Sequence, residues 1–182
     1  MAKVLVPLAT GFEEIEAITI IDVLRRADIE VVSVCLERRR VMGAHGIRVL
    51  SDRHIADVDY KEFDMIVLPG GLPGATNLRD NAQVKQLLEN FDADHKYIAA
   101  ICAAPIALDR AKVLKKAFTC YPSFENQIDH KGYFSEESVV SDQNIITSKG
   151  PATAMEFAIF LVEKLQSKTA ADAIAQGLLL RP

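Results

Sequence analysis

The sequence has few cysteines, little net charge and no long apolar run, and each shortage excludes a class of protein. Its three cysteines are an odd number without C-x-x-C spacing, which indicates neither a disulfide framework nor a zinc site. A net charge of −4 offers no obvious match to a nucleic-acid backbone. No apolar stretch reaches the roughly 18 residues that span a bilayer, and the first residues lack the apolar core of a signal peptide. We therefore expect a soluble, cytoplasmic protein without a metal, a membrane partner or a specific nucleic-acid site.

What the sequence does contain is a regular alternation of apolar runs and helical patterns. A chain of 182 residues without repeats or linkers predicts a single domain over 1–182. This alternation, with apolar strands, predicts an α/β doubly wound sandwich, in which a mostly parallel sheet has helices on both faces. Strands are expected at 2–9, 29–37, 46–52, 64–71, 96–101 and 116–124, a hairpin at 138–150, and helices at 13–27, 80–94, 103–111, 151–166 and 169–180.

Sites in such sheets form outside the carboxyl ends of the strands. Three segments fall there: "TGFEE" after the first strand, "PGGLPG" after the apolar strand residues 64–68, and Cys102 after the 96–101 strand. We therefore expect all three on one side of the molecule.

Cys102 lies between a buried strand and the first turn of a helix. The run "AICAA" around it has the form small-x-nucleophile-x-small, which is typical of a nucleophile elbow. A helix N-terminus beneath the sulfur is expected to favour the thiolate and lower its pKa. The alternative is a buried, inert cysteine. We expect this packing role for Cys35, within a strand, and a structural role for Cys120.

The segment "GFEEIEA" places acidic residues at the start of a helix. Acidic residues there suit the helix dipole, which is sufficient to explain Glu14. Glu13 and Glu16 are three residues apart and project on similar faces. Glu16 lies beside the apolar stripe, so its carboxyl group is expected to be partly buried, with a raised pKa, and to donate a hydrogen bond to the sulfur. These carboxylates would repel a phosphate, which argues against a nucleotide cofactor.

Glycines and histidines complete the candidate set. Gly70 and Gly71 are expected to let backbone N–H groups point at a reacting oxygen, the alternative being a tight turn. No Cys–His–Asp triad is evident, and His130 is predicted in an exposed polar loop.

Five motifs, in order, carry a resemblance over essentially the whole chain: "GFEEIEA", "VLRRA", "DMIVLPGG", "AAICAAP" and "TSKGPATAMEFA". Together they resemble the ThiJ/PfpI superfamily and, within it, the DJ-one subfamily. The resemblance implies a flavodoxin-like fold, a homodimer and no cofactor. It also implies that Cys102 is an oxidation-prone nucleophile hydrogen-bonded by Glu16. Further site residues implied are Gly71 and Ala103 as backbone donors, Gly70 as the residue shaping their loop, Pro151 at the pocket wall, and Glu13 and Arg26 as pocket and dimer-interface groups.

An alternative for Arg26 is a simple surface salt bridge with Asp22, four residues before it. Three departures from the family pattern matter. Ala103 stands where PfpI-type peptidases tend to have histidine, which argues against proteolysis. Tyr121 aligns with a pocket histidine of some members, and a phenol still donates a hydrogen bond. His45 lies near a position that is often arginine, so its charge would depend on pH.

The resemblance implies two functions that use the same residues. In the first, Cys102 attacks a small 2-oxoaldehyde such as methylglyoxal, or an early aldehyde adduct of a protein or nucleotide, and Glu16 moves the proton. In the second, the protein is a redox sensor or stress-linked chaperone in which Cys102 oxidises to a sulfinate held by Glu16. The sequence does not separate them.

Overall fold

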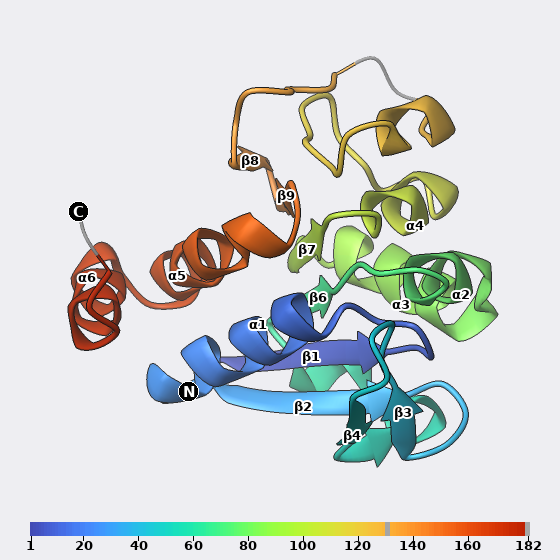
Figure 1. Cartoon of the computed structure of the whole chain (residues 1–182), viewed down its shortest axis with the longest axis horizontal. Coiled ribbons are helices and arrows are strands. Elements are labelled where there is room, and N and C mark those ends of the chain that lie inside the picture. The colour runs from blue at the N-terminus through green and yellow to red at the C-terminus, as the bar shows by residue number, and fades with distance from the viewer. Residues whose placement is uncertain (130–131, 181–182) are drawn as a thin grey trace.

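The computed structural model describes residues 1–129 and 132–180, and these contain a seven-stranded sheet (Figure 1). The strand order is β5-β2-β1-β6-β7-β9-β8, and every neighbouring pair is parallel except β8 with β9. The predicted α/β, mostly parallel architecture is confirmed. The strands are β1 (Lys3–Leu8), β2 (Glu30–Cys35), β5 (Arg53–His54), β6 (Met65–Leu68), β7 (Tyr97–Ile101), β8 (Val139–Asp142) and β9 (Ile145–Ser148).

Helices cover both faces of this sheet, and β6 is buried throughout because it lies between them. On one face α1 (Glu14–Arg26) packs on α5 (Ala154–Leu165), with α6 (Lys168–Gly177) outside α5. The other helices, α2 (Gly74–Asp80), α3 (Ala82–Ala93) and α4 (Pro105–Arg110), pack together. Short 3-10 helices are η1 (Ile55–Asp57), η2 (Tyr60–Glu62), η3 (Phe124–Gln127) and η4 (Pro151–Thr153).

Three expectations about local structure were wrong or incomplete. Residues 116–124 form no strand, only an isolated bridge between Phe118 and Tyr133, because β9 already has β7 on one side and β8 on the other. The 46–52 segment contributes β4 (Arg48–Leu50), which pairs with β3 (Arg40–Met42) outside the main sheet. Helix α2 was not predicted, since it is short and begins at a glycine. His130 lies outside the described residues.

The three loops expected at the carboxyl edge of the sheet do meet there. The N–H of Glu13 donates to the carbonyl of Gly70 at 3.0 Å, and the N–H of Gly74 donates to Gly11 at 3.1 Å. Gly71 has φ +87°, and a Cβ there would collide with the backbone of Glu13. This close approach joins the β1–α1 loop to the β6–α2 loop. Among the helices of residues 1–129 and 132–180, none combines the length and the apolar composition that a membrane-spanning segment needs.

Candidate active site

Cys102 occupies a strained turn between β7 and α4. Its φ of 64° is in the left-handed region, which costs a non-glycine residue roughly 1–3 kcal/mol. Neighbouring segments hold it there: its N–H donates to Ser148 and its carbonyl accepts from Tyr121, both at 2.9 Å. Cys102 is 8% exposed, whereas Cys35 and Cys120 are 0% exposed. The backbone therefore has the sharp turn that the small-residue pattern predicts.

Glu16, in the first turn of α1, is fully buried and faces this turn. Its Oε2 accepts a hydrogen bond from the N–H of Gly70 at 2.7 Å. Its Oε1 is buried and accepts no hydrogen bond of ordinary geometry from the described residues. Burial raises the pKa of Glu16 to about 7, against the opposing effects of the Gly70 N–H and the Cys102 thiol. A proton on this carboxyl group removes the cost of a buried, unpaired carboxylate oxygen.

The thiol of Cys102 has a raised pKa, and the expectation of a lowered one was wrong. Burial, together with a smaller contribution from the Glu16 carboxylate, raises the pKa to about 12, although the N–H groups of Gly71 and Ala103 oppose the increase. Helix α4 begins only at Pro105 and has six residues, so its dipole does not outweigh burial and a neighbouring negative charge. The contribution of Glu16 disappears when that carboxyl group is protonated.

The glycine pair leaves room for this arrangement. A Cβ at Gly70 would lie 2.6 Å from the Cβ of Cys102 and 2.8 Å from Oε2 of Glu16. No side chain fits there without displacing one of the two. The Gly70–Gly71 segment is therefore a tight turn, and it also presents the N–H of Gly71 to the sulfur.

Tyr121 lies beside Cys102, and its ring approaches Gly150, the residue before Pro151. The N–H of Tyr121 donates to the Cys102 carbonyl, and the phenol ring, 47% exposed, packs beside Gly150. A Cβ at Gly150 would be 3.2 Å from this ring. Pro151 follows at the start of η4. The structure thus brings Tyr121 to the edge of the site, and the position of Pro151 at the pocket wall stays a prediction.

Asp22 and Arg26 do not reach the site. They form an ion pair with 2.7 Å between Oδ2 and Nε, and both side chains are about half exposed. A rise of 1.5 Å per residue places Arg26 roughly 15 Å along α1 from Glu16. The surface salt bridge is therefore the interpretation that the contacts support, and an interface role stays a prediction.

Glu14 is a residue whose role the sequence analysis missed. It is buried, and it accepts hydrogen bonds from the backbone N–H of His45 at 2.7 Å, from His45 Nδ1 at 2.9 Å and from the N–H of Ile47 at 3.3 Å. Burial alone would raise the pKa of Glu14, but these hydrogen bonds outweigh it and lower the pKa. The same contact raises the pKa of His45. Glu13, the N-cap of α1, accepts from the N–H of Glu16.

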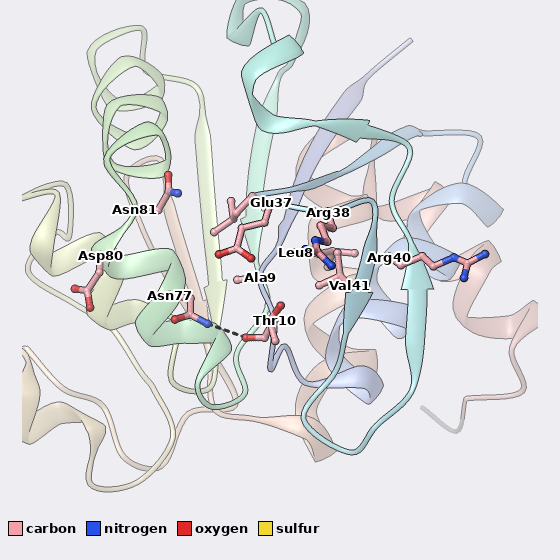
Figure 2. Close-up of a pocket in the computed structure, with 11 residues that line it drawn as sticks. Leu8, Ala9, Thr10, Glu37, Arg38, Arg40, Val41, Asn77, Asp80 and Asn81 are labelled. Carbon is pink, nitrogen blue, oxygen red and sulfur yellow. Dashed lines mark hydrogen bonds between the residues drawn. The ribbon is translucent and has the colours of Figure 1, made fainter.

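A separate cavity of about 310 Å³ opens near the ends of β1 and β2 (Figure 2). Its lining comes from these strand ends, from β3 and from α2, where the side chain of Asn77 donates to the carbonyl of Thr10 at 2.9 Å. None of its lining residues is a predicted site residue. The cavity is therefore distinct from the Cys102 site.

Comparison with known proteins gives matches over nearly the whole chain. The sequence profile of the DJ-1/PfpI family matches residues 2–164. Protein dj-1beta of Drosophila melanogaster is 41% identical over 179 residues, covering 97% of this chain and 96% of the fly protein. The crystal structure of the fly protein superposes with a TM-score of 0.96 at 40% identity, covering 100% of this chain and 99% of that one.

Two further relatives bear on length and function. Protein DJ-1 homolog B of Arabidopsis thaliana is 39% identical over 183 residues, which is 99% of this chain but 42% of the plant protein. This chain thus spans less than half the length of that relative. A Caenorhabditis elegans protein named glutathione-independent glyoxalase DJR-1.2 is 34% identical over 169 residues, covering 92% of this chain and 90% of the worm protein.

Proposed function

The chain belongs to the DJ-1/PfpI family, and on this premise we propose that it is a cysteine-dependent glyoxalase that needs no cofactor. Its substrates would be small 2-oxoaldehydes such as methylglyoxal, or the early adducts that such aldehydes form on proteins and nucleotides. The glyoxalase name of the worm relative supports the reaction class. The observation that carries the proposal is the pairing of Cys102, on a strained turn, with a buried Glu16 whose pKa is about 7.

The first step is attack of the Cys102 sulfur on the aldehyde carbon. A pKa of about 7 leaves the Glu16 carboxyl group roughly half ionised at neutral pH, so its carboxylate form is available to accept the thiol proton. The aldehyde oxygen takes up the electron pair of the broken π bond, and the N–H groups of Gly71 and Ala103 would stabilise its negative charge. Protonation of this oxygen gives a hemithioacetal.

The second step moves hydrogen between the two carbons of the substrate. The Glu16 carboxylate removes the proton from the former aldehyde carbon, which leaves an enediolate. The hydroxyl proton of this enediolate passes from the former aldehyde oxygen to the former ketone oxygen, and Glu16 then returns its proton to the former ketone carbon. The product is the thioester of a 2-hydroxy acid. Water then attacks the thioester carbonyl, releasing the hydroxy acid and restoring the thiol, so no external oxidant or reductant is consumed.

The test is lactate formation from methylglyoxal by metal-free protein. Cys102→Ser should abolish turnover, and Glu16→Gln should lower it by about 10²-fold or more, as expected for loss of an acid–base group. Cys120→Ser, which changes a fully buried thiol outside the mechanism, is the matched control and should retain activity. Equal lactate formation by wild type and Cys102→Ser would contradict the proposal.

A redox sensor or stress-linked chaperone is the second candidate, and a specific observation favours it. Glu16 is poised to hold a proton, so it can donate a hydrogen bond to a sulfinate oxygen on Cys102. If neither wild type nor Cys102→Ser forms lactate, while mild peroxide adds two oxygens to Cys102, this second function replaces the first.

We also propose that the chain is a cytoplasmic homodimer. Ile15 and Ile18 on α1 are 58% and 43% exposed, and this apolar surface suits an interface between two copies. Burial of α1 in the dimer would bring His45 towards the pocket of the partner.

A further inference from the structure

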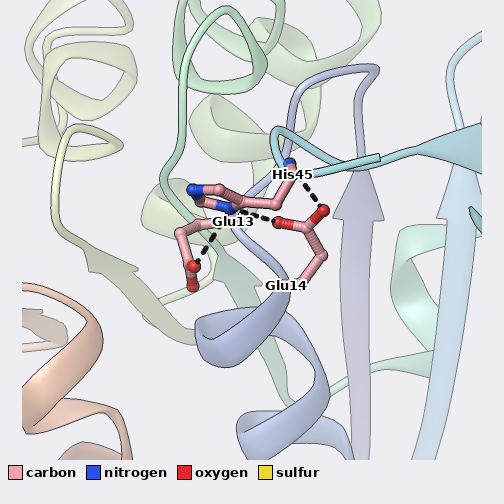
Figure 3. A group of neighbouring side chains, drawn as sticks. All are labelled: Glu13, Glu14 and His45. Atoms are coloured by element: carbon pink, nitrogen blue, oxygen red, sulfur yellow. Dashed lines mark hydrogen bonds and ion pairs between the residues drawn. The ribbon is translucent and has the colours of Figure 1, made fainter. Parts of the chain in front are cut away.

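A second cluster of ionisable side chains lies at the N-terminus of α1. It consists of Glu13, Glu14 and His45, hereafter the Glu–Glu–His cluster (Figure 3). The two carboxylate side chains are 8% and 7% exposed, whereas the imidazole is 70% exposed. One polar atom from each residue lies within 4.8 Å of the other two. The proposed reaction of Cys102 uses none of these three side chains.

Each carboxylate is held through one oxygen and presents the other to the same ring nitrogen. Oε2 of Glu13 accepts from the N–H of Glu16 at 2.7 Å, while its Oε1 lies 3.8 Å from His45 Nδ1 and accepts no hydrogen bond from the described residues. Oε1 of Glu14 accepts from the N–H groups of His45 and Ile47, while its Oε2 lies 2.9 Å from His45 Nδ1. Backbone donors thus fix both carboxylates with one oxygen of each directed at the imidazole.

We propose that the Glu–Glu–His cluster binds a divalent cation of the zinc type through Glu13 Oε1, Glu14 Oε2 and His45 Nδ1. Zinc takes nitrogen and carboxylate ligands at about 2.0–2.2 Å in a tetrahedron, which separates neighbouring ligand atoms by roughly 3.3 Å. The observed separations of 2.9 and 3.8 Å from Nδ1 lie on either side of that value. Small side-chain movements are therefore sufficient to form the site.

Charge and accessibility support a cation at this place. Two nearly buried carboxylates put two negative charges beside one imidazole, and a divalent ion compensates both. In the single chain the exposed side of His45 leaves the fourth coordination position open to water, and in the proposed dimer this side would face the pocket of the partner. On binding, the metal replaces any proton on Nδ1, and that proton moves to Nε2 or to solvent. The N–H groups of Glu16 and Ile47 serve as the supporting contacts that orient the ligands.

The test uses untagged Cys102→Ser protein, because the thiol is a competing zinc ligand. Calorimetric titration with zinc alone should show one saturable site per chain. Loss of a residue that only supports a metal ligand typically weakens metal binding by roughly 10–100-fold. His45→Asn and Glu13→Gln each remove a ligand, so each should weaken zinc binding by at least that factor. Glu13→Gln keeps an acceptor for the α1 cap and removes only the charge. The matched control is His95→Asn, an exposed histidine in the turn before β7, which should bind zinc as the parent does.

Cobalt(II) gives a second readout, since its visible absorption changes when water ligands are replaced by a protein site. Absence of saturable zinc binding, or equal affinity in His45→Asn and its parent, would overturn the proposal. The cluster would then be only an ion pair that fixes loop 43–47. Because the Cys102→Ser parent has no nucleophile, neither result bears on the glyoxalase proposal, and loss of that proposal would leave this one standing.

Discussion

Replacing Glu16 by glutamine should make the protein more stable at neutral pH. The amide has the shape of the carboxyl group, so its oxygen can accept from the Gly70 N–H as Oε2 does at 2.7 Å. Its NH2 group takes the place of a protonated Oε1, which as a carboxylate oxygen accepts no hydrogen bond of ordinary geometry within residues 1–129 and 132–180. The variant therefore resembles the neutral form of the wild-type site, and it cannot form the buried carboxylate.

The size of the effect follows from proton linkage. A pKa difference of one unit between the folded and unfolded states corresponds to about 1.36 kcal/mol. A change from 4.5 to about 7 thus corresponds to about 3 kcal/mol. Because the folded state binds the proton more tightly, this stabilisation is fully present below pH 4.5. It is lost as the pH rises and has disappeared above about pH 7.

The assay is urea unfolding of wild type and Glu16→Gln at intervals from pH 4.5 to 8. The difference in unfolding free energy should grow in favour of the variant with rising pH, by about 3 kcal/mol in total. His45 and Glu14 also have shifted pKa values, but they are common to both proteins and cancel in the difference. Glu156→Gln, an exposed change on α5, is the control and should leave the pH profile unchanged.

A difference that stays constant from pH 4.5 to 8 would refute the reasoning, because it would mean that Glu16 titrates alike in the folded and unfolded chain. A wild type that gains stability relative to the variant as pH rises would refute it more strongly. That result would make the buried carboxylate, rather than the acid, the favoured form.

Three further outcomes are expected. The alkylation rate of Cys102 should still be rising with pH beyond pH 9, since its pKa is about 12. Glu16→Gln should lower the thiol pKa, because it removes a negative charge beside the sulfur. An unchanged thiol pKa in the variant would contradict the electrostatic coupling between Glu16 and Cys102. Gly70→Ala should destabilise the protein by about 1–3 kcal/mol in thermal or urea unfolding, because its Cβ would lie 2.6 Å from that of Cys102; unchanged stability would show that the turn relaxes freely. Light scattering at micromolar concentration should give the mass of a dimer, and Ile18→Glu should shift it towards the monomer; a monomeric wild type would count against the proposed interface.

The sequence was sufficient to predict the parts of the site that depend on local pattern. Small residues on both sides of Cys102 indicate a sharp strand-to-helix turn, and the structure has one at φ 64°. The position of Glu16 beside an apolar stripe predicts a buried carboxyl group with a raised pKa, and this is confirmed. Both inferences need only neighbouring residues and the periodicity of one helix.

The errors concern contacts between distant segments. Glu14 has its partners 31 and 33 residues away, so its pattern alone does not distinguish it from an ordinary first-turn acid. Residues 116–124 look like a strand, but whether they join the sheet depends on which segment already borders β9. The pKa of Cys102 was predicted in the wrong direction because the dipole of a following helix was expected to dominate. In the structure α4 has six residues, and burial of the thiol is the largest effect on its pKa.

That error changes how the reactivity of Cys102 is explained. A helix dipole would act on the thiol at every pH, whereas a neighbouring carboxyl group acts only according to its own proton. When Glu16 is ionised, both burial and its negative charge disfavour the Cys102 thiolate. When Glu16 is protonated, only burial disfavours the thiolate, while the N–H groups of Gly71 and Ala103 stabilise it. The pair is then best described as sharing one proton. Turnover of an aldehyde needs Glu16 to accept the thiol proton and then to remove and return a proton of the substrate, whereas a sulfinate needs a proton that stays on Glu16. The same two residues therefore suit both proposed functions. The two functions differ in the proton on Glu16, which the glyoxalase reaction exchanges and a stable sulfinate retains.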